Sequence, residues 1–295
     1  MSHLKGHIQV ATASVMYGTV GIFIKFLHDM QIGSMIFYRL LFAVAALVFY
    51  LWYTGRLKDL RIHEKKGLVL ILLLGLFQGM NMLAYFISVT YTTVSIAVLL
   101  LYTAPIYVTI LSPFILKERN TSRDLWALIC SIGGVILIIQ PQALTHGMDG
   151  MYIVGLVAGL ASGMCFAGMI MTSRSLRDSY TGIVQATWAL CIATVLFVPY
   201  SWAVPSGVLL DKLFILILLG LIPTALSLTL YFSGLVLVRA QNASIIGLLE
   251  PLSAVVLSFL ILHESMSMTT LLGGGFILLA AFLASGEKPV GMMHE

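Results

Sequence analysis

The chain has 295 residues, of which 60% are hydrophobic and 9% are charged, and its formal net charge is +4 at pH 7. Water-soluble domains are about half apolar and about a quarter charged, so this composition excludes a protein that folds around one core in water. The small net charge also gives no indication of a nucleic-acid-binding surface. The lipid bilayer is therefore the expected solvent for most of the chain.

Apolar segments of suitable length follow one another along the whole sequence. A hydrocarbon core about 30 Å thick needs about 20 helical residues. In the first half this criterion predicts helices over residues 8–27, 32–53, 67–89, 94–116 and 125–139. In the second half it predicts helices over residues 151–171, 182–203, 213–236, 243–262 and 270–285. We therefore predict an all-α integral membrane protein with ten transmembrane helices and no soluble domain.

The positions of the basic residues predict the orientation in the membrane. Of the 16 Lys and Arg residues, only Lys212 falls between helices on the side away from the N-terminus, and Lys25 and Arg39 lie within helices. All the others lie on the N-terminal side. Because basic residues concentrate on the cytoplasmic side of membrane proteins, we predict a multi-pass plasma-membrane protein with both termini in the cytoplasm.

An internal repeat divides the chain in two. Pro105 is followed after 13 residues by Glu118, and Pro251 is followed after 13 residues by Glu264, so both pairs are offset by 146 residues. Each half contains an odd number of predicted helices, so the second half must enter the membrane with the opposite polarity. We predict five-helix repeats over residues 1–141 and 148–287 in inverted topology, an architecture typical of secondary transporters.

Several short motifs resemble those of a known family. Tyr17-Gly18 in the first predicted helix, Lys25 near its end and Tyr38-Arg39 in the second are typical, as are the two proline segments that end at Glu118 and Glu264. Together they resemble the drug/metabolite transporter superfamily and its EamA-type members. The resemblance covers nearly the whole chain and implies transport of amino acids, other metabolites, nucleotide sugars or lipophilic compounds. The usual Gly-Glu-Arg is Lys-Glu-Arg at Glu118 and His-Glu-Ser at Glu264, which leaves the subfamily open.

Ionisable side chains within hydrocarbon are costly, so they are candidates for function. Arg39 lies about 10 Å from one side of the membrane and Glu250 about 10 Å from the other, by the rise of a helix. A carboxyl group in apolar surroundings favours its neutral form and can carry a proton. Glu250 is therefore a candidate for proton coupling or for binding a substrate amine. The alternative is a structural role for Glu250 beside the proline, and for Arg39 a bond between helices.

Polar and aromatic side chains at mid-depth are further candidates for substrate binding. With Arg39 and Glu250, the predicted set is Tyr17, Gln78, Asn81, Tyr85, Tyr102, Gln185, Trp188, Ser227 and Tyr231. Pro105 and Pro251 predict bends or hinges in the fourth and ninth helices, because proline removes a helical hydrogen bond. Gate candidates are Lys25, Glu118 and Glu264. The series Gly155, Gly159 and Gly163 predicts close helix packing.

The predicted function is secondary transport of a small metabolite by alternating access, with amino-acid export favoured. Export of lipophilic drugs or of another metabolite class stays open, as does a non-transporting membrane scaffold. An intramembrane enzyme is not expected, because His263-Glu264 lacks the second histidine of a zinc-protease motif and no nucleophile elbow occurs. No cofactor or metal is expected. The expected partners are the substrate and the bilayer, in a monomer or a homodimer.

Overall fold

The computed structural model describes residues 2–27, 29–62, 64–118, 120–139, 150–202, 204, 206–262 and 267–285. The helices of the first half are α1 (Ser2–Gly18), α2 (Val20–Phe26), α3 (Ile32–Tyr53), α4 (Lys65–Tyr91), α5 (Val94–Leu101), α6 (Ala104–Ile115) and α7 (Ser122–Ile139). Those of the second half are α8 (Gly150–Ser175), α9 (Gly182–Phe197), α10 (Ser206–Gly220), α11 (Ser227–Leu237), α12 (Ala240–Gly247), α13 (Leu249–Leu262) and α14 (Met268–Ser285). The short elements are η1 (Leu57–Leu60), η2 (Val198–Tyr200) and a π-helical segment η3 (Leu221–Leu226).

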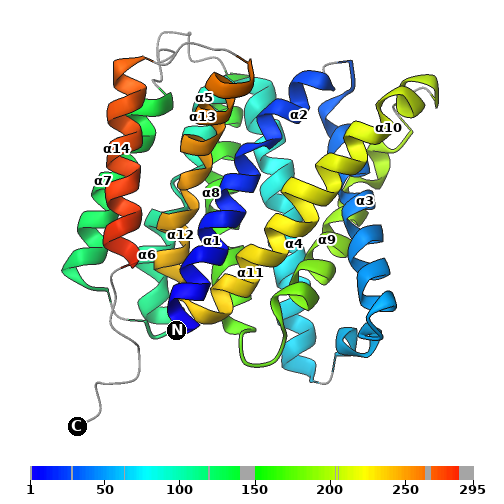
Figure 1. Cartoon of the computed structure of the whole chain (residues 1–295), viewed down its shortest axis with the longest axis horizontal. Helices are drawn as coiled ribbons and strands as arrows, with labels where there is room; N and C mark the ends of the chain where they lie inside the picture. Colours follow the sequence, from blue (N-terminus) through cyan, green and yellow to red (C-terminus); the bar gives the residue numbers. More distant parts are fainter. Residues whose placement is uncertain are drawn as a thin grey trace.

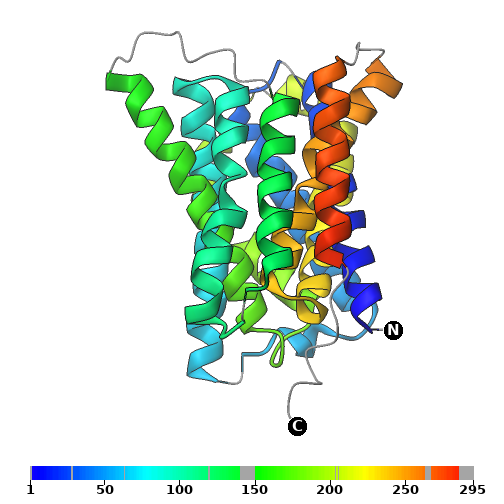
Figure 2. The same ribbon diagram turned by 90° about the vertical axis from the view of Figure 1, so that its left-hand side faces the viewer.

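The described residues contain ten helical spans that are long and apolar enough to cross a bilayer, which confirms the predicted all-α membrane fold. α1 begins and α14 ends at the same face of the bundle, which we call the N-terminal face (Figure 1). α6, α8 and α11 also end at this face, and α7, α9 and α12 begin there (Figure 1, Figure 2). The assignment of this face to the cytoplasm stays a prediction.

Four helix boundaries differ from the prediction by four or more residues. α1 begins at Ser2 instead of residue 8, and α9 ends at Phe197 instead of residue 203. α8 extends to Ser175 and α10 begins at Ser206, whereas the hydropathy pattern ended the sixth helix at 171 and began the eighth at 213. Charged residues lie at both places, Arg174 at the end of α8 and Lys212 near the start of α10. Helices continue beyond the hydrocarbon where polar groups can reach water or pair with one another, so apolar length alone truncates them.

The fourth and ninth spans are each interrupted next to their proline. Pro105 cannot donate a hydrogen bond to the Leu101 carbonyl, and Pro251 cannot donate one to the Gly247 carbonyl. α5 accordingly ends at Leu101 and α12 ends at Gly247, and new helices start at Ala104 and Leu249. Two other irregular places were not predicted, namely the break at Thr19 between α1 and α2 and the π-helical turn at η3.

Small residues set the closest helix contacts. A Cβ atom on Gly163 would lie 2.7 Å from the Leu100 carbonyl oxygen, and one on Gly155 would lie 3.2 Å from the Tyr91 carbonyl carbon. The glycine series of α8 therefore packs against α5 and the end of α4, as predicted. α7 and α14 also lie side by side along one edge of the bundle (Figure 1, Figure 2).

The α7–α14 contact gives a stability prediction with a matched control. A Cβ atom on Gly134 would lie 2.7 Å from the Gly273 carbonyl oxygen and 3.1 Å from the Ile277 amide nitrogen, whereas one on Gly133 would meet nothing within 4 Å. Gly134→Ala should therefore destabilise the protein by about 1–3 kcal/mol through overpacking. Gly133→Ala should leave it unchanged or slightly more stable, because alanine favours helix. Thermal unfolding in detergent measures both, and equal melting temperatures would contradict this packing.

Candidate functional site

The two proline-associated breaks meet at Glu250. This residue lies in the first turn of α13, directly after the break that follows α12. Tyr102 lies in the corresponding break between α5 and α6 and is 6% exposed. The Tyr102 side chain hydrogen-bonds Glu250. Tyr102 and Leu248, which the 146-residue offset relates, also share one apolar cluster. The inverted repeats thus bring their irregular segments together in the middle of the bundle.

Side chains from four more elements interact electrostatically with Glu250. They are Tyr17 of α1, Arg39 of α3, Tyr85 of α4 and Tyr231 of α11. We call Tyr17, Arg39, Tyr85, Tyr102, Tyr231 and Glu250 the central cluster. All six side chains lie inside the bundle. Four of them still have partly accessible surfaces, namely Tyr17, Arg39, Tyr85 and Glu250. Each of these four side chains therefore keeps part of its surface uncovered by other protein atoms.

Gly18 allows α1 to approach Glu250 closely. A Cβ atom there would lie 2.8 Å from the Ala254 amide nitrogen and 2.9 Å from the Glu250 carbonyl oxygen, both backbone atoms of α13. The Ser253 hydroxyl donates to the Glu250 carbonyl at 2.8 Å on the same side. The Tyr17-Gly18 pair places an aromatic ring next to Glu250 because the following residue leaves room for α13.

Arg39 faces the central cluster with an unpaired donor. Its Nε atom is buried and has no hydrogen-bond partner, a condition that costs about 1–3 kcal/mol for a buried polar group. Among the described residues, no carboxylate lies within ion-pair distance of Arg39, although Glu250 acts on it electrostatically. The centre of the bundle therefore holds one basic and one acidic side chain that do not pair directly.

The polar residues of α4 form a stripe directed into the bundle. Gln78, Asn81 and Tyr85 follow helical spacing, so they share one side of α4. A neighbouring side carries Gly75 and Gly79 against α9, and another carries Phe77 and Ser88 against α8. The exposed Leu76 and Met80 lie on the remaining side. The amide oxygens of Gln78 and Asn81 are buried and have no hydrogen-bond partner.

Three other predicted binding residues already use their polar atoms within the protein. Gln185 accepts from Ser173 and donates to the Tyr180 carbonyl at 2.9 Å. Trp188 donates to the Leu60 carbonyl at 3.2 Å, and Ser227 donates to the Ile222 carbonyl at 3.0 Å. Their role in substrate binding stays a prediction.

Two of the gate candidates, Lys25 and Glu118, lie at opposite faces of the bundle. Lys25 is exposed in the last turn of α2, at the face opposite the N-terminal face. Lys212 of α10 lies 3.5 Å from Asp29 there, between its Nζ and the carboxylate Oδ2. Glu264 lies outside the described residues.

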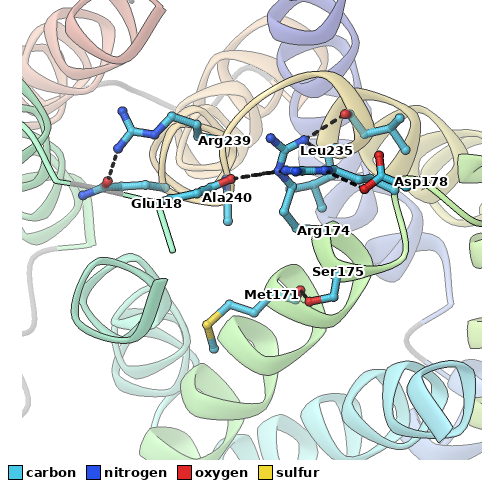
Figure 3. A network of polar contacts seen from close by, with 11 residues as sticks. Glu118, Met171, Arg174, Ser175, Asp178, Leu235, Arg239 and Ala240 are labelled. Atoms are coloured by element: carbon cyan, nitrogen blue, oxygen red, sulfur yellow. Dashed lines mark hydrogen bonds and ion pairs between the residues drawn. The ribbon is translucent and has the colours of Figure 1, made fainter. Parts of the chain in front are cut away.

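Glu118 lies in a polar network at the N-terminal face (Figure 3). Lys117 has a left-handed backbone conformation, with φ of 56°, which turns the chain after α6 and lets the Glu118 amide donate back to the Ser112 carbonyl at 3.4 Å. The Glu118 carboxylate accepts from Arg174 Nε at 2.9 Å and from the Ala240 amide at 3.0 Å. Arg174 Nη1 also donates to the carbonyls of Leu235 and Val236, at 2.9 and 2.8 Å.

A second buried ion pair extends this network. Arg239 Nη2 lies 3.1 Å from Asp124 Oδ2 and 3.0 Å from Gln241 Oε1. Gln241 in turn donates to the Thr109 hydroxyl at 3.2 Å. Asp124 is 1% exposed and Arg239 is 7% exposed, so both charges are shielded from water.

In the sequence, Arg174 and Arg239 contribute to the charge asymmetry that orients the protein, and no motif singles out Asp124. One signal for Arg174 was present, because an offset of 149 residues relates it to Lys25, which was a gate candidate. The partners of Arg239 and Asp124 lie far away in the chain, so no local pattern indicates them.

Comparison with known proteins places the chain in a family. The model of the EamA-like transporter family matches residues 4–140 and 153–286. An uncharacterized transporter of Archaeoglobus fulgidus is 28% identical over 291 residues, which cover 96% of this chain and 97% of that protein. The uncharacterized inner membrane transporter YicL of Salmonella typhimurium is 25% identical, with 95% of each chain covered.

A solved crystal structure shares the fold, with a TM-score of 0.79 and 16% identity over 95% of this chain and 96% of that chain. At this identity the likeness concerns the fold alone. The family match extends over both five-helix halves, including the elements that carry the central cluster and the N-terminal face network. The protein therefore belongs to the EamA-like transporter family and is a membrane transporter.

Proposed function

We propose that this protein is a secondary transporter that moves a small metabolite through the central cluster by alternating access. We propose an amino acid or a closely related metabolite as the substrate and export as the direction. The observation that carries the proposal is the separation of Arg39 and Glu250, one basic and one acidic side chain in the centre of the bundle with no direct ion pair.

A zwitterion matches this arrangement at both ends. Its carboxylate would accept hydrogen bonds from Arg39, whose planar guanidinium suits a carboxylate. Its ammonium group would lie near the Glu250 carboxylate and the surrounding tyrosine rings, which attract cations through their faces. Binding would thereby give the unpaired Arg39 Nε a partner.

The inverted repeat supports the mechanism. Binding sites of such transporters lie near the middle of the membrane, where interrupted helices of the two repeats meet. Rocking of one repeat against the other then exposes the binding site to each side of the membrane in turn. With positive residues at the N-terminal face, we propose that this face is cytoplasmic in the plasma membrane.

A lipophilic cation is the second candidate substrate. The observation in its favour is the presence of four tyrosines near a single carboxylate, Glu250, which resembles the aromatic surroundings of bound organic cations. Such a substrate would need no carboxylate and would leave Arg39 without a role in binding.

Counterflow into proteoliposomes tests the proposal. Vesicles loaded with unlabelled amino acids should accumulate a radiolabelled amino-acid pool when the protein is present. Arg39→Gln should lower this uptake by about tenfold or more, because a hydrogen bond to a charged group contributes about 1.5–3 kcal/mol. Arg56→Gln is the control, since Arg56 lies after α3 and pairs with Asp59 at the N-terminal face. Absence of counterflow with cooperatively folding protein would contradict amino-acid transport, and flux of an organic cation that Arg39→Gln leaves unchanged would support the second candidate.

A further inference from the structure

We propose that Glu118, Arg174, Asp124 and Arg239 form a latch that holds the N-terminal face closed by clamping the turn between α11 and α12. The latch rests on the proposed function in one respect, because alternating access requires this face to open during the cycle. In the present conformation the latch is closed, and release of the α11–α12 turn is the step that opens the face.

The latch works through the ends of two helices. The last carbonyl groups of a helix and its first N–H groups lack partners within the helix, and its C-terminus is negative and its N-terminus positive. Arg174 donates to Leu235 and Val236 at the end of α11, and Glu118 accepts from Ala240 at the start of α12. Each charge thus faces the helix end of opposite sign, and the 2.9 Å ion pair joins the two (Figure 3).

The two ion pairs and the bond from the Ala240 amide to Glu118 tie the two repeats together. Glu118 at the end of α6 and Asp124 in α7 belong to the first repeat, whereas Arg174, Arg239 and Ala240 belong to the second. The side chains of Arg174 and Glu118 are 8% and 9% exposed. Separating one partner from a buried ion pair leaves an uncompensated charge, so the repeats cannot move apart at this face without a substantial cost.

The equivalent turn at the opposite face is built differently. The 146-residue offset relates the α11–α12 turn to the turn between α4 and α5. There Thr92 donates its hydroxyl to the Ser88 carbonyl at 2.7 Å, and the Thr93 hydroxyl accepts from the Ile96 amide at 3.3 Å. Both helix ends of that turn are therefore capped by the turn's own residues and can move together with their caps. The α11–α12 turn instead takes its caps from Arg174 of α8 and from Glu118 after α6. Glu118 belongs to the other repeat, so its cap on α12 and its ion pair with Arg174 are lost when the repeats separate at this face.

A buried position behind the latch allows a direct test. Ser112 of α6 is fully buried, and its carbonyl accepts the Glu118 amide. In the test, Cys130, Cys165 and Cys191 are replaced with alanine and Ser112→Cys is introduced. The rate at which the new thiol reacts with a membrane-impermeant maleimide is then measured in nanodiscs. In this background the thiol should react slowly. Glu118→Gln and Arg174→Gln should each accelerate labelling about tenfold or more, because hydrogen bonds between charged groups contribute about 1.5–3 kcal/mol.

Arg177→Gln is the matched control. Arg177 Nη1 lies 3.9 Å from the same Glu118 oxygen, but its side chain is 40% exposed, and exposed ion pairs contribute little. The Arg177→Gln variant should therefore leave the labelling rate of Ser112→Cys unchanged. Unchanged labelling in Glu118→Gln and Arg174→Gln variants that still unfold cooperatively would overturn the latch, as would rapid labelling in the background that carries the intact network.

The charge-swapped variant E118R/R174E tests the role of the helix ends. It restores attraction between the two side chains but puts a cation at the start of α12 and an anion at the end of α11. We expect it to label as fast as the single variants, whereas a return to slow labelling would overturn the helix-end part of the proposal. Since labelling needs no substrate, a latch that behaves as expected together with absent amino-acid counterflow would reject the proposed substrate alone.

Discussion

Glu250→Gln is expected to abolish transport driven by a pH gradient while leaving substrate exchange measurable. Glutamine keeps the size of the side chain and an oxygen that can accept from Tyr102, but it cannot take up or release a proton. Because Glu250 is the carboxylate of the central cluster, we expect at least an about 100-fold loss of proton-driven uptake, the scale of effects for a group that transfers protons. Uptake by proteoliposomes with and without an imposed pH gradient measures the effect.

Two comparisons make this result specific to Glu250. Glu64→Gln removes an exposed carboxylate just before α4 and should leave both modes of transport unchanged. Exchange at saturating substrate should persist in Glu250→Gln, with weaker binding of a substrate ammonium group. A variant with the pH response of the unmodified protein would remove Glu250 from proton coupling. Loss of both modes in a folded variant would instead assign it to substrate binding alone.

Gly18→Ala is expected to lower both stability and transport, whereas Gly21→Ala should change neither substantially. A methyl group on Gly18 would approach the α13 backbone to within 2.9 Å at the Glu250 carbonyl oxygen, and one on Gly21 would meet nothing within 4 Å. Overpacking of this kind costs about 1–3 kcal/mol. Since the displaced segment is the first turn of α13, the shift would move Glu250 relative to Tyr17 and Tyr102.

Thermal unfolding and counterflow of the two glycine variants measure these effects together. We expect a lower melting temperature and about tenfold weaker counterflow for Gly18→Ala, by the equivalence of about 1.4 kcal/mol to one factor of ten. Both substitutions add the same methyl group to the first span, so their difference reports the contact with α13. Equal behaviour of the two variants would show that α1 does not position this site.

Much of the fold follows from local sequence properties. Each span is apolar over about 20 residues, so hydropathy located all ten, and it misplaced boundaries by four or more residues only in α1, α8, α9 and α10. The repeated proline also located two helix breaks, because a missing N–H group acts on its own helix. The break at Thr19 has no comparable signal, since it arises where Gly18 packs against α13.

The candidate site is harder to predict from the sequence than the fold. Lipid and the interior of the bundle are similarly apolar, so hydropathy does not tell which side of a helix faces inward. Gln78, Gln185 and Trp188 are therefore equivalent candidates by hydropathy alone. Only the contacts distinguish them. Trp188 donates its N–H to the Leu60 carbonyl, and the Gln185 amide uses both its oxygen and its nitrogen in hydrogen bonds. The Gln78 amide oxygen has no hydrogen-bond partner.

Segment composition and a spacing of 146 residues are enough to establish the membrane solvent, the number of spans and the inverted relation of the two halves. Which charged side chains come into contact depends on the packing of the helices. Arg174 reaches Glu118, and Glu250 reaches Tyr102, only because the repeats pack against each other. A buried charge is stabilised by partners at hydrogen-bond distance, and those partners lie in distant parts of the chain.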